Sequence, residues 1–214
     1  MNTIMRKTAL GIAGLAFAGG VAAAPFTATP AEAKPANTIH QDKRDSKGKE
    51  LDIKYEAQSN FYYCGPAATR NALSASGHHL GQDEAAKQLG TTEDGTNSAE
   101  DTTRVLNKVT GGNKYKTTAI PDRNADDKQT NKLADDIKRT VDDGRAVVAN
   151  IAGTATDTTG GTHSFEGGHY ISVVGYRDNA KTVKIADSAN PNTASYWMAT
   201  DNLADWIATR GYSA

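Results

Sequence analysis

The chain has 214 residues and a net charge of −1 at pH 7, with 24 Lys and Arg residues against 25 Asp and Glu residues. This length is enough for one domain of ordinary size, and the near-neutral charge gives no reason to expect nucleic acid or an acidic polymer as a partner. The only cysteine, Cys64, excludes an internal disulfide, so its thiol either pairs with another molecule or stays free.

The first 33 residues have the pattern of a secretory signal peptide. A short basic start precedes residues 9–24, which are almost wholly apolar or small but too rich in Ala and Gly for a membrane span. Small residues at signal-peptidase spacing end at Ala24 and again at Ala33. We expect cleavage after Ala33, because cleavage after Ala24 would leave Pro25 beside the scissile bond; the alternative is an uncleaved anchor. The mature protein is expected to be secreted and extracellular.

Residues 34–50 are polar and lack apolar periodicity, which predicts a disordered lead-in. No second linker and no internal repeat follows. One folded domain is therefore expected over residues 51–214.

The first half of this domain has helical periodicity. Helices are predicted over residues 67–75, 83–89, 102–109 and 128–143, and each is followed by a glycine. In the last of them, Leu133, Ile137 and Val141 are spaced four apart and form one apolar stripe.

The second half changes to the β-branched and aromatic composition of strands. Strands are predicted over residues 146–151, 170–176, 183–186 and 196–199, followed by a short helix over residues 202–210. The Thr- and Gly-rich segment 154–168 is predicted to be a long loop, and long loops in compact domains often serve function. Helices first and strands later predict an α+β domain of two layers.

Cys64 stands directly before the first predicted helix. Pro66 suits the first turn of a helix, so Cys64 is expected at its N-terminus, where unpaired backbone N–H groups and the helix dipole favour an anion. The thiolate is the nucleophilic form of cysteine. Gly65 is expected to let the backbone approach a substrate. The alternative is a buried core cysteine, but a lone thiol in an exported chain favours the reactive interpretation.

A thiolate nucleophile needs a base, and histidine has the right pKa range. His169 is the best candidate, because it follows Gly167-Gly168 and opens the most strand-like run of the chain, which gives it rigid support. The other histidines lie in the lead-in or in predicted loops: His40, His78, His79 and His163.

The group that orients this base is expected to be Asp187. Asp187 ends the strand after the one that His169 opens, and the short turn near Asp178-Asn179 predicts a hairpin that brings both residues side by side. Asp187 could instead be a simple turn residue, and Asn190 is a weaker candidate for the same role.

Acyl transfer also needs donors for the developing oxyanion. Gln58 lies six residues before Cys64 in an extended stretch, so its amide and the backbone N–H of Cys64 could converge on one oxygen. The mechanism requires no cofactor, and without other cysteines or metal-binding His spacing no metal site is expected.

Together these residues resemble the C39-like peptidases of the papain-like superfamily. The matching segments, spread over residues 53–212, are Gln58 with Cys64–Ala67, Gly168–Tyr170 before a valine-rich strand, and Asp187 after the next strand. The resemblance implies a papain-like fold, in which a helix bearing the nucleophile packs on an antiparallel sheet, and hydrolysis of peptide or amide bonds. It implies Cys64 as nucleophile, His169 as general base and then acid, Asp187 as orienter, and Gln58 as oxyanion donor.

Other functions are compatible with the same pattern. A transglutaminase-like acyltransferase has the same order of Cys, His and Asp but passes the acyl group to an amine. Cell-wall amidases resemble the chain less, since they commonly draw on a second histidine and none follows His169. A non-catalytic binding module on a papain-like scaffold is the third alternative. The expected partner is a peptide or protein substrate, not nucleic acid.

Overall fold

A computed structural model describes residues 48–214 of the protein. The predicted signal peptide, residues 1–33, and nearly all of the predicted lead-in, residues 34–50, lie outside the described residues. The described part opens with strand β1 (Lys49–Glu50), which pairs antiparallel with β4 (Thr162–Arg177). Lys49 and Glu50, the end of the predicted lead-in, thus pair with the sheet.

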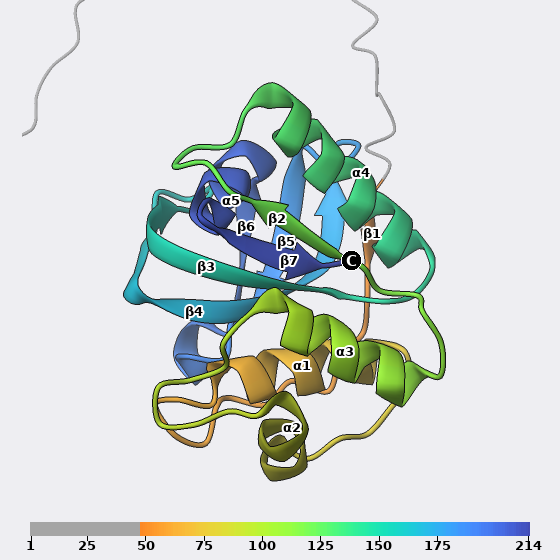
Figure 1. Ribbon diagram of the computed structural model, residues 1–214. Helices are drawn as coiled ribbons and strands as arrows, with labels where there is room; N and C mark the ends of the chain where they lie inside the picture. Colours follow the sequence, from red (N-terminus) through yellow and green to blue (C-terminus); the bar gives the residue numbers. More distant parts are fainter. Residues whose placement is uncertain (1–47) are drawn as a thin grey trace, which may run out of the picture. The chain divides into compact units, whose positions relative to one another are not determined.

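The described strands form one seven-stranded antiparallel sheet in the order β2-β7-β3-β4-β5-β6, with β1 beside β4 (Figure 1). The remaining strands are β2 (Thr117–Ile120), β3 (Val147–Thr156), β5 (Thr182–Ala186), β6 (Ser195–Ala199) and β7 (Arg210–Ser213). The sequence does not predict β2 and β7, since strands this short show too little alternation to be recognised. The predicted helix over 202–210 ends at Ile207, and Arg210 already belongs to β7.

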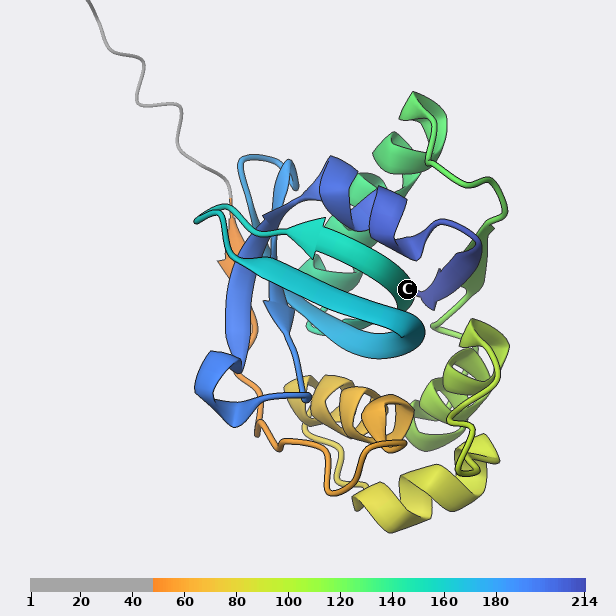
Figure 2. The same cartoon turned by 90° about the vertical axis from the view of Figure 1, so that its left-hand side faces the viewer.

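Helices cover both faces of this sheet (Figures 1 and 2). On one face lie α1 (Cys64–Ala75) and α3 (Ala99–Thr110), with α2 (Gln82–Leu89) packed outside them; on the other lie α4 (Asp127–Asp142) and α5 (Thr200–Ile207). The predicted α+β class is confirmed, but the expectation of two layers is wrong. The central strands are apolar on both sides: Val147 and Ala149 face the α4–α5 side, while Val148 faces α1. A strand buried on both faces needs cover on both.

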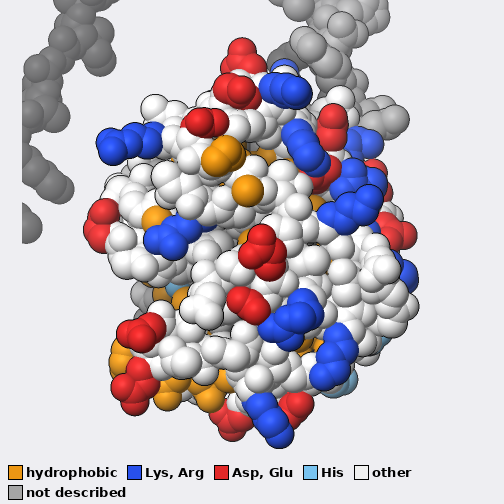
Figure 3. All heavy atoms as spheres, in the orientation of Figure 1, with side chains coloured by type: hydrophobic (Ala, Val, Ile, Leu, Met, Phe, Trp, Pro, Cys, Tyr) orange, Lys and Arg blue, Asp and Glu red, His pale blue; other side chains and the backbone are white. Residues whose placement is uncertain are grey.

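The surface is mixed in charge. On the face shown in Figure 3, Lys and Arg side chains lie among Asp and Glu side chains, as the near-neutral net charge leads one to expect. No helix among residues 48–214 combines the length and the apolar character that a bilayer span requires.

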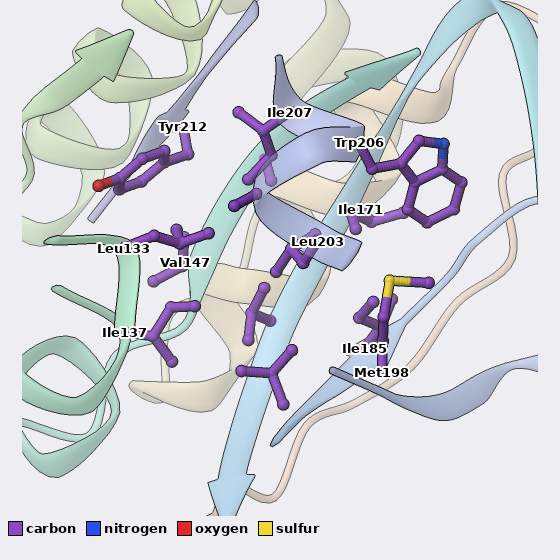
Figure 4. Packing of buried hydrophobic residues seen from close by; sticks show 14 of the residues in the cluster. Leu133, Ile137, Val147, Ile171, Ile185, Met198, Leu203, Trp206, Ile207 and Tyr212 are labelled. Atoms are coloured by element: carbon purple, nitrogen blue, oxygen red, sulfur yellow. The ribbon is translucent and has the colours of Figure 1, made fainter. Parts of the chain in front are cut away.

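The larger core lies between the sheet and the pair α4 and α5. The predicted stripe of Leu133, Ile137 and Val141 is fully buried there, and Figure 4 shows Leu133 and Ile137 beside Val147 of β3. Trp206 of α5 is 2% exposed, and its indole N–H donates a 3.0 Å hydrogen bond to the carbonyl of Gly153. Helix α5 is thereby tied to β3 by both packing and a polar contact.

The second core holds the helix that begins with Cys64. Ala68, Ala72 and Leu73 of α1 pack against Val148 and Tyr170 of the sheet. Small alanine side chains allow a close approach of helix and sheet, and Ser172 of β4 donates a 2.8 Å hydrogen bond to the carbonyl of Ala68. The start of α1 is therefore held rigidly over the strands.

The prediction of a long loop over residues 154–168 is wrong, because most of this segment extends the hairpin formed by β3 and β4. Gly153 pairs with Phe165, and pairing continues to Thr156 and Thr162, after a bulge between Ile151 and Gly153. Only residues 157–161 form the turn, where Asp157 accepts a 2.9 Å hydrogen bond from the backbone N–H of Gly161. The glycines of this segment suggested a loop, but its threonines favour strands, and glycine in a strand commonly marks a bulge.

Candidate active site

Cys64 is the first residue of α1 and is partly exposed. This is the position that the sequence predicts, and the side chain packs against the edge of the smaller core without being fully buried. The preceding residue, Tyr63, makes no side-chain hydrogen bond to the helix start. The backbone N–H groups at the start of α1 therefore receive no side-chain cap from Tyr63.

His169 lies where the glycine pair meets the buried part of β4. Gly168 has φ of +96°, a conformation that suits glycine, and the chain enters β4 with the His169 side chain only 4% exposed. The imidazole stacks on Phe165 with the ring centroids 4.0 Å apart. One ring nitrogen, Nε2, lies 2.8 Å from Oδ1 of Asp187, and the Cys64 side chain is close enough to the ring to raise the pKa of His169. Since Nε2 is occupied, Nδ1 is the nitrogen left for the sulfur.

The charge of His169 follows from these two neighbours. Burial by itself lowers the pKa of His169, but hydrogen bonds and charge from Asp187 and Cys64 outweigh it and raise that pKa from 6.5 to about 9. The imidazolium form is thus favoured at neutral pH. A cationic imidazole between a carboxylate and a sulfur stabilises a thiolate.

Asp187 follows β5 and is 4% exposed. Besides His169, its carboxylate accepts hydrogen bonds from the backbone N–H of Ala189 at 3.0 Å and from the hydroxyl of Tyr196 at 2.9 Å. Burial by itself raises the pKa of Asp187, but the hydrogen bonds and the charge of His169 keep it below its ordinary value. Asp187 thus forms the turn that the alternative interpretation suggested and also faces His169.

The other candidate orienter is used elsewhere. Asn190 accepts a 2.9 Å hydrogen bond from the backbone N–H of Asn192 and so begins a short 3₁₀ helix over Pro191–Thr193. Its side-chain oxygen is engaged in that cap, whereas Asp187 contacts the imidazole directly.

Gln58 lies beside the chain that follows Asp187. Its backbone N–H donates to the carbonyl of Ser188 at 2.9 Å, and its side-chain amide donates to the carbonyl of Asn60 at 2.9 Å. Among residues 48–214 no hydrogen bond joins Gln58 to Cys64. The amide has a second N–H, so its role toward an oxyanion stays a prediction.

Gly65 has a different environment from the one expected. A Cβ at this position would lie 2.8 Å from Cβ of Thr96 and closer still to its hydroxyl. Thr96 is fixed in turn, because its carbonyl accepts a 3.1 Å hydrogen bond from Tyr170. Gly65, the residue after Cys64, therefore makes room for the segment before α3.

The remaining histidines are placed away from Cys64 or outside the described residues. His163 belongs to β4 and not to a loop: it bonds to Asp157 at 3.0 Å and stacks on Tyr196 at 3.7 Å. His78 contacts Ser76 and His79 contacts Lys54, while His40 lies outside the described residues. Within residues 48–214 no group of three His, Cys, Asp or Glu side chains is arranged to hold a metal ion.

Three aromatic residues that support the site are not predicted from the sequence: Phe165, Tyr196 and Tyr55. Tyr55 donates a 2.9 Å hydrogen bond to the backbone carbonyl of Asp187. The signal for Tyr196 was present, since it opens a predicted strand, but its use depends on the β5–β6 register, which pairs Tyr196 with Ile185.

Comparison with known proteins adds to this geometry. Residues 50–214 match the family model described as "Peptidase_C39 like family". A solved structure described as a C39-like peptidase from Bacillus anthracis superposes with a TM-score of 0.53 at 13% identity, covering 77% of this chain and 96% of that chain. At this identity the likeness shows the fold alone.

Two further solved structures have lower scores, and no argument rests on them. The peptidase domain of Streptococcus ComA, a bi-functional ABC transporter, has a TM-score of 0.49 at 15% identity over 77% of this chain and 96% of that one. A double-glycine-motif protease from an AMS/PCAT transporter, solved in complex with the leader peptide, has a TM-score of 0.47 at 12% identity. The match covers 77% of this chain and 91% of that chain. Among curated proteins the sequence has no significant match.

Proposed function

The chain belongs to the Peptidase C39-like family, and from this premise we propose that it is a cysteine peptidase that hydrolyses peptide or amide bonds. Cys64 is the nucleophile, His169 the general acid and base, and Asp187 the group that orients His169. The observation that carries the proposal is the buried imidazole of His169, which lies beside both the carboxylate of Asp187 and the side chain of Cys64. His169 bonds to Asp187 at 2.8 Å through Nε2, and the Cys64 side chain is close enough to raise the pKa of the same imidazole. A rigid nucleophile–base–orienter set is what covalent acyl transfer requires.

The first half of the reaction makes a thioester. The Cys64 thiolate attacks the carbonyl carbon of the scissile amide, and the carbonyl π electrons move to oxygen. The backbone N–H of Cys64, with a side-chain N–H of Gln58, donates to this oxyanion. The tetrahedral intermediate collapses as the C–N bond breaks, and His169 gives its Nδ1 proton to the departing amine.

The second half returns the enzyme to its starting state. His169, now neutral, accepts a proton from a water molecule, and the water oxygen attacks the thioester carbon. The C–S bond then breaks, the carboxylic acid leaves, and the thiolate is restored beside the imidazolium. Asp187 holds Nε2 throughout, so that Nδ1 always faces the sulfur. This sequence of steps needs neither a metal nor a cofactor.

Family membership favours hydrolysis over the transferase and over the binding module. A transferase would use the same first half but would bring an amine to the thioester. A binding module would have no need for a buried imidazole whose pKa is raised to about 9 by an acid and a thiol. We also propose that the protein acts outside the cell, which rests on the N-terminal pattern of residues 1–33.

The test is a comparison of wild-type protein with Cys64→Ala and Cys64→Ser on a random peptide library, read by mass spectrometry. We expect new peptide ends with the wild type only, while circular dichroism shows the same fold in all three. A parallel incubation with a fluorescent primary amine separates hydrolase from transferase, since only a transferase would attach the amine. Equal turnover by wild type and Cys64→Ala would remove the proposal.

A further inference from the structure

A cavity of about 230 Å³ lies next to the proposed active site. Its walls come from the start of α3 and the segment before it, from β2, from β3, and from the start of β7 with the residue before it. The residues that matter for its chemistry are Asn97, Ser98, Glu100, Asn150 and Arg210.

Two contacts place this cavity beside the catalytic pair. A Cβ on Gly168, the residue before His169, would lie 3.4 Å from a guanidinium nitrogen of Arg210. On the other side, Asn97 of the lining follows Thr96, which packs against Gly65, the residue after Cys64. Arg210 of the lining thus lies next to the residue before His169, and the segment that carries Asn97 reaches the residue after Cys64.

Arg210 supplies a positive charge without a counterion. Within residues 48–214 no carboxylate pairs with its guanidinium, whereas other arginines are paired: Arg70 with Glu56, Arg104 with Asp101, Arg139 with Asp136 and Arg145 with Asp143. A partly buried guanidinium keeps its charge and presents a planar fork of donors that fits a carboxylate.

We propose that this cavity is a substrate subsite that receives an acidic side chain, Asp or Glu, of the peptide, and that Arg210 is the residue that selects it. This inference rests on the proposed function and names the substrate class for that site. A carboxylate in the cavity pairs with Arg210, whereas a basic side chain is repelled and a neutral one leaves the guanidinium without a partner.

Glu100 is the opposing charge of the cavity. Its carboxylate accepts a 3.2 Å hydrogen bond from the hydroxyl of Ser98 and is exposed, so water and salt screen it more than Arg210. Its presence weakens the selection without reversing it. Removing this carboxylate should therefore strengthen the preference for acidic peptides. This change is opposite in direction to the one expected from removing Arg210.

The experiment uses two quenched-fluorescence peptide libraries of neutral residues, one with a single fixed Glu and the other with Gln in its place. We expect wild type to cleave the Glu library with kcat/KM about tenfold higher, the range for a charge-assisted hydrogen bond. Arg210→Gln should bring the ratio near one, Arg210→Lys should give an intermediate ratio, and Glu100→Gln should raise it. Arg123→Gln, an exposed arginine that does not line the cavity, is the matched control and should keep the wild-type ratio.

A second measurement separates this proposal from the proposed function. Binding of matched Glu and Gln peptides to Cys64→Ala, with and without Arg210→Gln, is read by fluorescence polarisation. A Glu preference that depends on Arg210, without turnover by the wild type, would keep the subsite and remove the peptidase. Turnover with equal rates on both libraries, or an unchanged ratio in Arg210→Gln, would overturn the subsite.

Discussion

The hydroxyl of Tyr196 donates a 2.9 Å hydrogen bond to Oδ2 of Asp187, the carboxylate oxygen that His169 does not use. The carboxylate is therefore held on both oxygens and cannot rotate away from the imidazole. Burial and the charge of Asp187 raise the pKa of Tyr196 well above its ordinary value, so this hydroxyl stays a donor at neutral pH. Orientation of the base thus depends on a third strand, β6.

Tyr196→Phe removes this bond without emptying the space. We expect kcat to fall about tenfold with KM nearly unchanged, because the bond contributes on the order of 1–2 kcal/mol to the alignment of Asp187. Tyr55→Phe is the matched control, since Tyr55 bonds only to the backbone carbonyl of Asp187 and should affect kcat less. An equal loss in both variants would mean that neither bond acts through the carboxylate.

The pH dependence of activity should follow His169. With its pKa raised to about 9, the imidazolium persists through neutral pH, and kcat/KM should decline as pH rises through about 9. Asp187→Asn removes the largest of the contributions that raise this pKa, so the decline should move to lower pH and the maximum should fall. A basic limb that stays in place in Asp187→Asn would show that another group controls it.

The same shift predicts a pH dependence of stability. The folded pKa of His169 lies above the unfolded value near 6.5, so protonation of His169 stabilises the fold fully below about pH 6.5, and this contribution is lost as pH rises through about 9. His169→Gln should therefore flatten the dependence of the free energy of unfolding on pH between these values. Urea unfolding of wild type and variant at pH 6 and pH 9.5 measures the difference.

The main residues of the candidate site can be picked out from the sequence, because each is marked by features of its own neighbours along the chain. Cys64 precedes a proline-started helix, His169 opens the strand richest in valine, and Asp187 closes the next one. The hairpin turn over Asp178–Ala180, where all three residues have positive φ, then brings His169 and Asp187 together. Each of these features needs only neighbours along the chain or one short turn.

The features that the sequence did not predict depend on contacts between distant segments. Tyr196 meets Asp187 only because β6 pairs with β5 in one register, and Thr96 meets Gly65 across the domain. The presence of helices on both faces of the sheet can be predicted only when it is known that successive residues of β3 place apolar side chains on each face. Register and packing of this kind are set by the whole fold.

Trp206 couples the stability of the domain to the strand pair that carries His169. Its indole N–H donates to the carbonyl of Gly153 at the bulge of β3. Trp206→Phe should lower the free energy of unfolding by about 1–3 kcal/mol, because it leaves a carbonyl unpaired and some space unfilled. Met198→Leu is the control: Met198 is fully buried and leucine has a similar volume, so this substitution should lower the free energy of unfolding less. Chemical denaturation measures both, and a Trp206→Phe protein as stable as wild type would contradict the contribution of this bond.

Gly65→Ala tests whether the residue after Cys64 must lack a side chain. Alanine is favoured over glycine by about 1 kcal/mol in the interior of a helix. If nothing lay close to Gly65, Gly65→Ala would therefore be expected to stabilise α1. Here the new Cβ would lie 2.8 Å from Cβ of Thr96, and either Thr96 or the start of the helix has to move. We expect Gly65→Ala to lower both stability and the rate at which iodoacetamide alkylates Cys64. The double variant Gly65→Ala with Thr96→Gly should recover much of the stability and of the alkylation rate, because the second change removes the side-chain atoms that the new Cβ would meet. If Gly65→Ala alone were more stable than wild type, the segment before α3 would have moved aside at little cost in free energy.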